Sequence, residues 1–273
     1  MSNVKCQMSN VKCQIFNLIG LYMSVAPPLV SIIMPSYNVS GSILDAINSV
    51  ISQSYTHWEL IIIDDCSTDD TVFKVSKVSD DRVKLIELNE NSGSPAHPRN
   101  IGIDASLGEF IAFLDADDRW KKDKLDVQIN HMLQEGADFS CSGYSIFKDG
   151  TEIKFFIPPE YVDHKKLLKN NSVGCLTAIV RRGTLGEMRF PLCGHEDFAL
   201  WLKLLKKTKY VLGVQNNLAD YNLVEGSVSH KKYKLFPYFW NIYRNEEKLS
   251  IGVSLYYCLR YFLNVVLVKY RKF

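Results

Sequence analysis

The chain has 273 residues, enough for one large domain or two small ones. Hydrophobic residues make up 47% and charged residues 23%, which is typical of a chain that buries a core and excludes intrinsic disorder as the starting assumption. The formal net charge is +2, and the basic residues are dispersed until the last few positions. No concentrated basic face therefore predicts a nucleic-acid partner.

The N-terminal segment and the cysteines carry little functional signal. Residues 1–7 (MSNVKCQ) recur unchanged at 8–14, a copy too short to be a structural repeat, and Met23 is an alternative start. The apolar stretch 15–25 is shorter than a signal anchor and lacks a cleavage site, so residues 1–27 are expected to be a peripheral extension. The seven cysteines form no CxxC pair, which favours reduced thiols in a cytoplasmic protein.

From residue 28 onward, apolar β-branched runs alternate with helical stripes. Strands are predicted at 29–34, 58–63, 83–88 and 110–114, the first stopping at Pro35, and helices at 42–53, 71–78, 98–107, 120–132 and 198–205. This order predicts an α/β fold with a mostly parallel sheet flanked by helices. The missing GxxxxGK[ST] and GxGxxG motifs argue against a kinase and a dinucleotide oxidoreductase.

Polar clusters follow three of the predicted strands. They are Pro35–Asn38, Asp64–Asp69 and Asp115–Asp118. Because parallel α/β sheets bind ligands at the carboxyl ends of their strands, these clusters are expected to converge on one edge. The sequence therefore predicts a ligand site there.

The sequence Asp115-Ala116-Asp117-Asp118 places three carboxylates within four residues. Such groups repel one another unless a cation lies among them. A hard divalent ion takes one or two carboxylates and completes its shell with substrate phosphates, which suits a diphosphate leaving group. A solvated turn with helix-capping acids is the alternative, and it stays open.

The other two strand ends and one loop offer candidate donor contacts. Asp65 can accept a hydrogen bond from a uracil-type base while Asp69 caps the next helix. Tyr37, flanked by Pro35, Ser36 and Asn38, offers a ring for base stacking, although packing would equally explain it. Arg99, at a predicted helix start, can pair with phosphate or with the acidic cluster, or belong to a plain surface loop.

Two later segments contain candidate functional groups. Gly194-His195-Glu196-Asp197 precedes an apolar helix, where acids are favoured by the helix dipole and can alternatively act as a general base. The segment lacks the HExxH spacing of a zinc protease. His230, in a polar loop, can ligate a metal or lie exposed to solvent.

Together these residues resemble glycosyltransferase family 2, the inverting enzymes with a GT-A fold. The resemblance rests on PSYN at 35–38, WELIIIDDCSTDDT at 58–71, RNIGIDASLGEFIAFLDADD at 99–118 and GHEDFALWLK at 194–203. It covers roughly residues 29 to 230, in the family's order. It implies a GT-A domain at 28–230, with a nucleotide-sugar half at 28–138, an acceptor half at 139–230 and a C-terminal helical tail at 231–273.

The resemblance also implies residue roles. Tyr37 would stack on the base, Asp65 would hold its imide, and Asp115 would lie near the ribose. Asp117 would ligate Mn²⁺ or Mg²⁺ on the diphosphate of a nucleotide-sugar donor, which the family favours as UDP. Asp197 would be the catalytic base with Glu196 beside it. The His97-Pro98 insertion before Arg99 departs from the common family pattern and leaves the role of Arg99 open.

The function implied is transfer of a sugar onto a glycan or lipid-linked acceptor of a surface polysaccharide, such as lipopolysaccharide or capsule. The alternative is a nucleotide-sugar binding protein that has lost catalysis, against which the presence of both Asp117 and Asp197 argues.

The tail at 249–273 is interrupted by Arg260 and Asn264, so it is a poor transmembrane span. Its apolar stripe and basic end fit an amphipathic helix on an anionic membrane, at the inner face of the cytoplasmic membrane. A helix packed on the domain fits equally well.

Overall fold

The computed structural model describes residues 26–223 and 235–270, and the part of the N-terminal extension before residue 26 lies outside them. The strands are β1 (Val30–Ser36), β2 (Trp58–Asp64), β3 (Val83–Glu87), β4 (Phe110–Phe113), β5 (Arg119–Trp120), β6 (Phe139–Lys148), β7 (Thr151–Phe156), β8 (Tyr161–Val162), β9 (Ile179–Arg181) and β10 (Val211–Asn222). The α-helices are α2 (Ile43–Ile51), α3 (Thr71–Val75), α4 (Ala96–Ala105), α5 (Lys124–Glu135), α6 (His164–Lys169), α7 (Arg182–Leu185), α8 (Glu196–Leu204), α9 (Leu235–Asn241) and α10 (Ile251–Tyr270), with the short turns η1 (Cys175–Thr177) and η4 (Ile242–Glu246).

One sheet runs through the molecule in the order β3-β2-β1-β4-β9-β6-β10-β5, with β7 beside β6 and β8 beside β10. Strand β1 pairs in parallel with β2 and β4, and β2 pairs in parallel with β3. Strand β9 is antiparallel to both β4 and β6, and β10 is parallel to β6, so β1, β2, β3, β4, β6 and β10 share one direction, while β7 and β9 run the opposite way. The predicted α/β fold with a mostly parallel sheet is confirmed.

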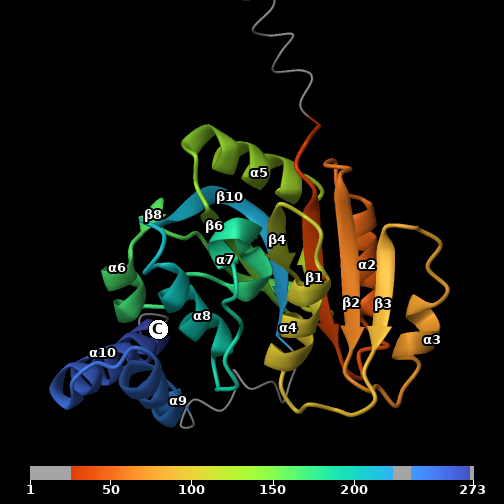
Figure 1. Cartoon of the computed structure of the whole chain (residues 1–273). Helices are drawn as coiled ribbons and strands as arrows, with labels where there is room; N and C mark the ends of the chain where they lie inside the picture. The colour runs from red at the N-terminus through yellow and green to blue at the C-terminus, as the bar shows by residue number, and fades with distance from the viewer. Residues whose placement is uncertain (1–25, 224–234, 271–273) are drawn as a thin grey trace, which may run out of the picture.

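Helices cover both faces of this sheet (Figure 1). Alternate residues of β1 point to opposite faces, as the pleat requires. Ile33 joins a cluster with α4, α8 and α9, whereas Ile32 and Met34 join a second cluster with α2 and α5. The core is therefore two apolar layers separated by the sheet.

Several predicted boundaries differ from the observed ones, and two of the differences have a clear physical reason. Pro35 does not end the first strand, because β1 continues to Ser36 in register with Asp64. The pairing of β1 with β4 stops at Ile33, so the missing N–H of Pro35 removes no bond on that side. Trp120 does not begin a helix: it pairs with Ala219 of β10 and its indole donates to the Leu176 carbonyl at 2.8 Å, so α5 begins at Lys124.

Helix α4 lies unusually close to the sheet. It begins at Ala96, which places Pro98 in the first turn, where a missing N–H costs no hydrogen bond. A β-carbon on Gly102 would meet Ile33 at 2.5 Å and Ile63 at 2.7 Å, so only glycine allows this approach. One turn earlier the same helix carries Arg99, which the close packing holds at the carboxyl edge of the sheet.

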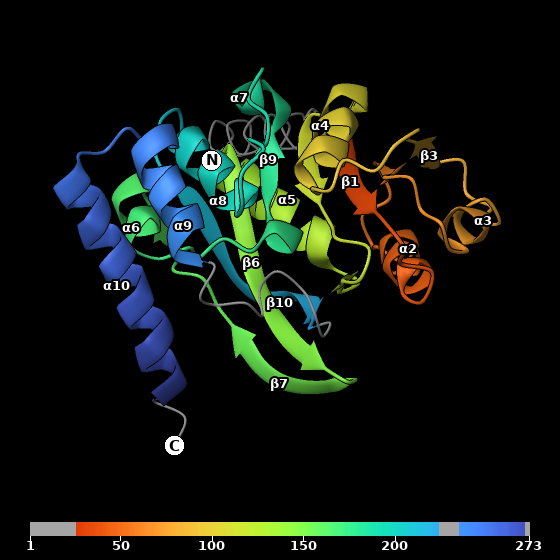
Figure 2. The same cartoon turned by 90° about the horizontal axis from the view of Figure 1, so that it is seen from below.

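The C-terminal helices pack beside α8, and Figure 2 shows α10 running along one side of the molecule next to α9. The rings of Phe239 and Tyr261 lie 3.8 Å apart, and those of Tyr243 and Tyr257 lie 5.5 Å apart. The Tyr243 hydroxyl also donates to the Leu168 carbonyl at 2.9 Å, so the tail packs on the domain, which is one of the two alternatives that the sequence left open. Within the described residues, no helix is both long and apolar enough to cross a membrane.

Candidate active site

The three polar strand ends meet, as the parallel sheet predicts. The Asp65 amide donates to the Ser36 carbonyl at 2.8 Å, which joins the ends of β1 and β2. The Ser42 hydroxyl donates to the Ala116 carbonyl at 3.0 Å, which joins the β1 side to the acidic segment after β4. Residues distant in sequence thus form one polar edge.

The segment after β2 contains three acids with different partners. Asp64 accepts from Ser67, and Asp69 accepts from the amide of Thr71, the first residue of α3, although the N-cap position itself is occupied by Asp70 and not by Asp69 as predicted. Asp65 is buried and accepts from the amide of Ser92 at 3.0 Å and from its hydroxyl at 2.9 Å. Ser92 was not identified from the sequence, because no local pattern connects it to a carboxylate 27 residues away.

The Pro35–Asn38 segment presents Tyr37 to solvent, with 47% of its surface exposed. Asn38 holds the turn at a positive φ of 50°, and its side-chain oxygen accepts from the Thr68 amide at 2.8 Å. The Asn38 carboxamide is therefore used to fix the neighbouring loop, and the free ring of Tyr37 is the group that a ligand can reach.

The acidic segment after β4 crowds its carboxyl groups together. Burial, followed by the charge of Asp115, raises the pKa of Asp117 to about 6. Burial also raises the pKa of Asp118 well above its ordinary value, with Asp115 and Asp117 adding to the effect. One oxygen of Asp118 accepts from the Asn222 amide at 2.8 Å, while the other has no hydrogen-bond partner among the described residues.

Two residues from the second half of the chain complete this acidic corner and were not identified from the sequence. Asn222, at the end of β10, also donates through its side chain to the carbonyl of Asp117. Tyr144, on β6, is buried close to both Asp118 and Asp197, and burial with these charges raises its pKa to about 12. Neither lies in a recognisable motif, since only the sheet order brings β6 and β10 to this edge.

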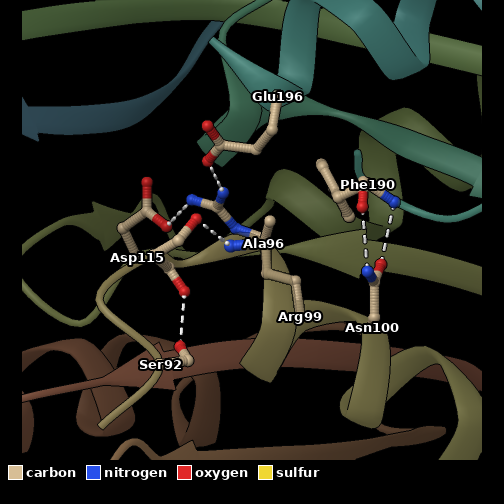
Figure 3. Close-up of polar contacts among 8 residues, drawn as sticks. Ser92, Ala96, Arg99, Asn100, Asp115, Phe190 and Glu196 are labelled. Carbon is tan, nitrogen blue, oxygen red and sulfur yellow. Dashed lines mark hydrogen bonds and ion pairs between the residues drawn. The ribbon is translucent and has the colours of Figure 1, made fainter. Parts of the chain in front are cut away.

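Arg99 connects the acidic segment to the start of α8. Its side chain is buried, and separate nitrogens donate to Asp115 at 2.6 Å and to Glu196 at 2.7 Å (Figure 3). Of the alternatives that the sequence left open, the structure shows pairing with the acids and excludes a plain surface position. Two charge-assisted bonds from one rigid guanidinium fix the spacing of the two acids.

The neighbouring residue Asn100 connects α4 to Phe190, in the segment that leads into α8. Its side-chain nitrogen donates to the Phe190 carbonyl at 2.9 Å, and its oxygen accepts from the Phe190 amide at 2.8 Å (Figure 3). Farther along α4, Asp104 pairs with Arg189, which lies in the segment before α8. Helix α4 therefore positions the segment that leads into Glu196 and Asp197.

The segment Gly194–Asp197 forms the start of α8. A β-carbon on Gly194 would lie 2.3 Å from the ring of Tyr238, so glycine is required for the contact with α9. His195 adopts a left-handed φ of 59°, which turns the chain into the helix. Burial and the charge of Glu196 raise the pKa of Asp197, while His195 opposes this rise.

The acidic residues after β4 are the candidate ligands of a divalent metal ion. Within 26–223 and 235–270, no group of three His, Cys, Asp or Glu side chains is arranged to hold an ion by itself, and His230 lies outside those residues. Asp117 and the unpartnered oxygen of Asp118 nevertheless form a buried, mutually repelling pair that a cation would relieve. These residues fit an ion shared with the phosphates of a ligand.

Similar proteins are known. The profile of glycosyl transferase family 2 matches residues 31–183. TuaG of Bacillus subtilis (strain 168), named as a teichuronic acid biosynthesis glycosyltransferase, is 41% identical over 88% of this chain and 96% of its own. WfgD of Escherichia coli, named as a UDP-Glc:alpha-D-GlcNAc-diphosphoundecaprenol beta-1,3-glucosyltransferase, is 38% identical over 85% of this chain and 92% of its own.

Among solved structures, S. aureus TarS in complex with UDP-GlcNAc is similar with a TM-score of 0.67 and 25% identity. The match covers 78% of this chain and 65% of the TarS chain.

Proposed function

The chain belongs to glycosyl transferase family 2 and is a glycosyltransferase, and we propose that it is a metal-dependent, inverting enzyme that uses a UDP-sugar. The observation that carries this proposal is Arg99, which joins Asp115, in the segment after β4, to Glu196, at the start of α8. A donor-side acid and an acceptor-side acid thereby belong to one site. The complexes of TarS with UDP-GlcNAc and the name of WfgD support the UDP-sugar donor.

The donor would bind at the edge formed by residues 28–138. The exposed ring of Tyr37 would stack on the base, and Asp65 would accept its imide N–H beside the Ser92 contact. Pro35 and Asn38 would shape this turn, and Asp115 with Ala116 would lie along the ribose. Arg99 would act on the donor through Asp115, because its guanidinium is already paired.

Asp117 would hold Mn²⁺ or Mg²⁺ together with the donor diphosphate, with His230 as a second candidate ligand. The raised pKa of Asp117 supports this role, because a cation is the group that would return a crowded acid to its charged form. When bound, the ion supplies positive charge to the departing diphosphate.

Asp197 would remove the proton from the acceptor hydroxyl as that oxygen attacks the anomeric carbon. A general base works best when its pKa lies near the operating pH, and the raised pKa of Asp197 moves this carboxylate in that direction. Glu196, held by Arg99, would keep Asp197 in place, and its charge contributes to the raised pKa. A single base and a departing nucleotide on the opposite face give an inverted product.

The acceptor is proposed to be a saccharide, or a lipid-linked saccharide, in the synthesis of a surface polysaccharide. TuaG and WfgD, which span most of this chain, support this by their names. Residues 139–230 would form the acceptor half and 231–273 a helical tail. A lipid-linked acceptor and a cytoplasmic donor would place the enzyme at the inner face of the cytoplasmic membrane.

A donor-release screen tests this function. Purified protein is incubated with a panel of nucleotide sugars, with and without a saccharide acceptor, in Mn²⁺ or in EDTA, and released nucleotide is measured. We expect metal-dependent release from a UDP-sugar that is lost in Asp117→Ala. If no donor is consumed even with acceptor present, and nucleotide binds only in a metal-independent way, the protein is a nucleotide-sugar binder that has lost catalysis.

A further inference from the structure

Helix α10 is apolar on two sides, and residues 26–223 and 235–270 cover one of them. Its inner side carries Ser254, Tyr257, Cys258 and Tyr261, and Ser254 and Cys258 are fully buried against the domain. Its outer side carries Ile251, Leu255, Tyr256, Leu259 and Leu263, whose exposed fractions range from 43% to 64%. A helix that is apolar all round is normally covered all round, and the described part of the chain leaves the outer side uncovered.

The charge of this region indicates which surface covers it. No Asp or Glu occurs from Lys248 to Phe273, whereas Lys248, Arg260, Lys269, Arg271 and Lys272 are basic. Arg260 is exposed, next to the outer apolar side chains. Two copies of such a segment would repel each other, whereas an anionic lipid surface would attract each one.

The inner side of α10 lies near the proposed catalytic base, with aromatic rings between them. Tyr261 lies 3.8 Å from Phe239, and Phe239 lies 5.1 Å from the ring of His195, measured between ring centroids. Burial and the nearby Asp197 carboxylate raise the pKa of Tyr261 to about 12. One layer of aromatic rings therefore separates the uncovered helix from the N-terminus of α8.

We propose that the outer side of α10 (Ile251, Leu255, Tyr256, Leu259, Leu263 and Arg260, here called the docking face) lies on an anionic phospholipid surface. The helix lies on this surface and does not span it. Docking holds Gly194–Asp197 near the bilayer, where the sugar of a lipid-linked acceptor is presented. This deepens the proposed function and rests on it for the acceptor, but lipid binding itself can be measured without donor or acceptor.

The test is co-sedimentation of the full chain with phosphatidylcholine vesicles, with and without phosphatidylglycerol. We expect binding to the anionic vesicles only. The triple variant Leu255→Ser, Leu259→Ser, Leu263→Ser should bind roughly tenfold more weakly because apolar contact area is lost. Arg260→Gln should weaken binding about fivefold.

A matched control removes three exposed apolar side chains elsewhere: Phe73→Ser, Leu107→Ser and Ile153→Ser. It should bind vesicles like the wild type. All variants should keep the wild-type melting temperature, since the replaced side chains are exposed. Donor release with a soluble acceptor should also be unchanged in both triple variants.

Three results would overturn the proposal. They are wild-type protein that stays in solution with anionic vesicles, equal losses in the two triple variants, and a dimer in light scattering that the α10 triple variant alone dissociates. The last result would assign the docking face to a second copy of the chain. Vesicle binding without sugar transfer would instead refute the proposed function and leave the lipid surface intact.

Discussion

Replacing Arg99 tests whether the buried guanidinium holds Asp115 and Glu196 together and stabilises the fold. Arg99 is buried and donates to Asp115 at 2.6 Å and to Glu196 at 2.7 Å. Arg99→Met leaves both carboxylates unpaired, and removal of one partner of a buried pair costs about 3–5 kcal/mol. Arg99→Lys cannot reach both acids at once, so it should lose one charge-assisted bond, about 2 kcal/mol.

The assay is urea unfolding at pH 7. In Arg99→Met the two carboxylates stay in place with no cation between them, so the full cost of removing one partner should appear. Arg189→Met is the matched control: it removes an arginine that pairs with Asp104 of the same helix, but at an exposed site, so its cost should stay below about 1 kcal/mol.

The account is refuted if Arg99→Met and Arg189→Met destabilise the protein equally. Such a result would mean that the Arg99 contacts do not determine the spacing of the two acids. The role of Arg99 in joining the halves of the site would then fall with it.

Three further outcomes follow from particular contacts. Asn100→Ala should lower the turnover number while nucleotide affinity stays unchanged, because Asn100 holds Phe190 and touches no donor-side acid; equal losses in turnover and affinity would contradict this. Burial lowers the pKa of Lys124 to about 7, so the folded protein loses this proton at a lower pH than the unfolded chain does. Between pH 7 and 9 the wild type should therefore gain about 2–3 kcal/mol of stability relative to Lys124→Met in denaturant unfolding. Parallel plots of stability against pH for the two proteins would contradict this. The raised pKa of Asp197 should place the acidic limb of the kcat/KM profile above the ordinary aspartate range near pH 4, and a limb at or below that range would exclude Asp197 as the base.

The parallel half of the fold could be predicted from local pattern. The runs LVSIIM and WELIII are apolar, β-branched and flanked by polar clusters, which is the signature of buried strands. Adjacent parallel strands necessarily bring their carboxyl ends together, so the meeting of Ser36, Asp65 and Ala116 followed from the order of elements.

The remainder depends on contacts between distant residues. Trp120 has helical neighbours in sequence, but its indole finds the Leu176 carbonyl 56 residues away, which holds it in a strand. Ser92, Asn222 and Tyr144 approach the acids only after the sheet has formed. The resemblance located the acids themselves, and their roles stay predictions until they are measured.

The division of labour between Asp117 and Asp197 is the central claim, and paired titrations test it most directly. Nucleotide binding is measured by calorimetry with and without Mn²⁺, and sugar transfer is measured on the same samples of wild type, Asp117→Asn and Asp197→Asn. Asp197→Asn should keep metal-dependent nucleotide binding and lose transfer, whereas Asp117→Asn should lose both. Full transfer by Asp197→Asn, or unchanged metal-dependent binding by Asp117→Asn, would contradict the account.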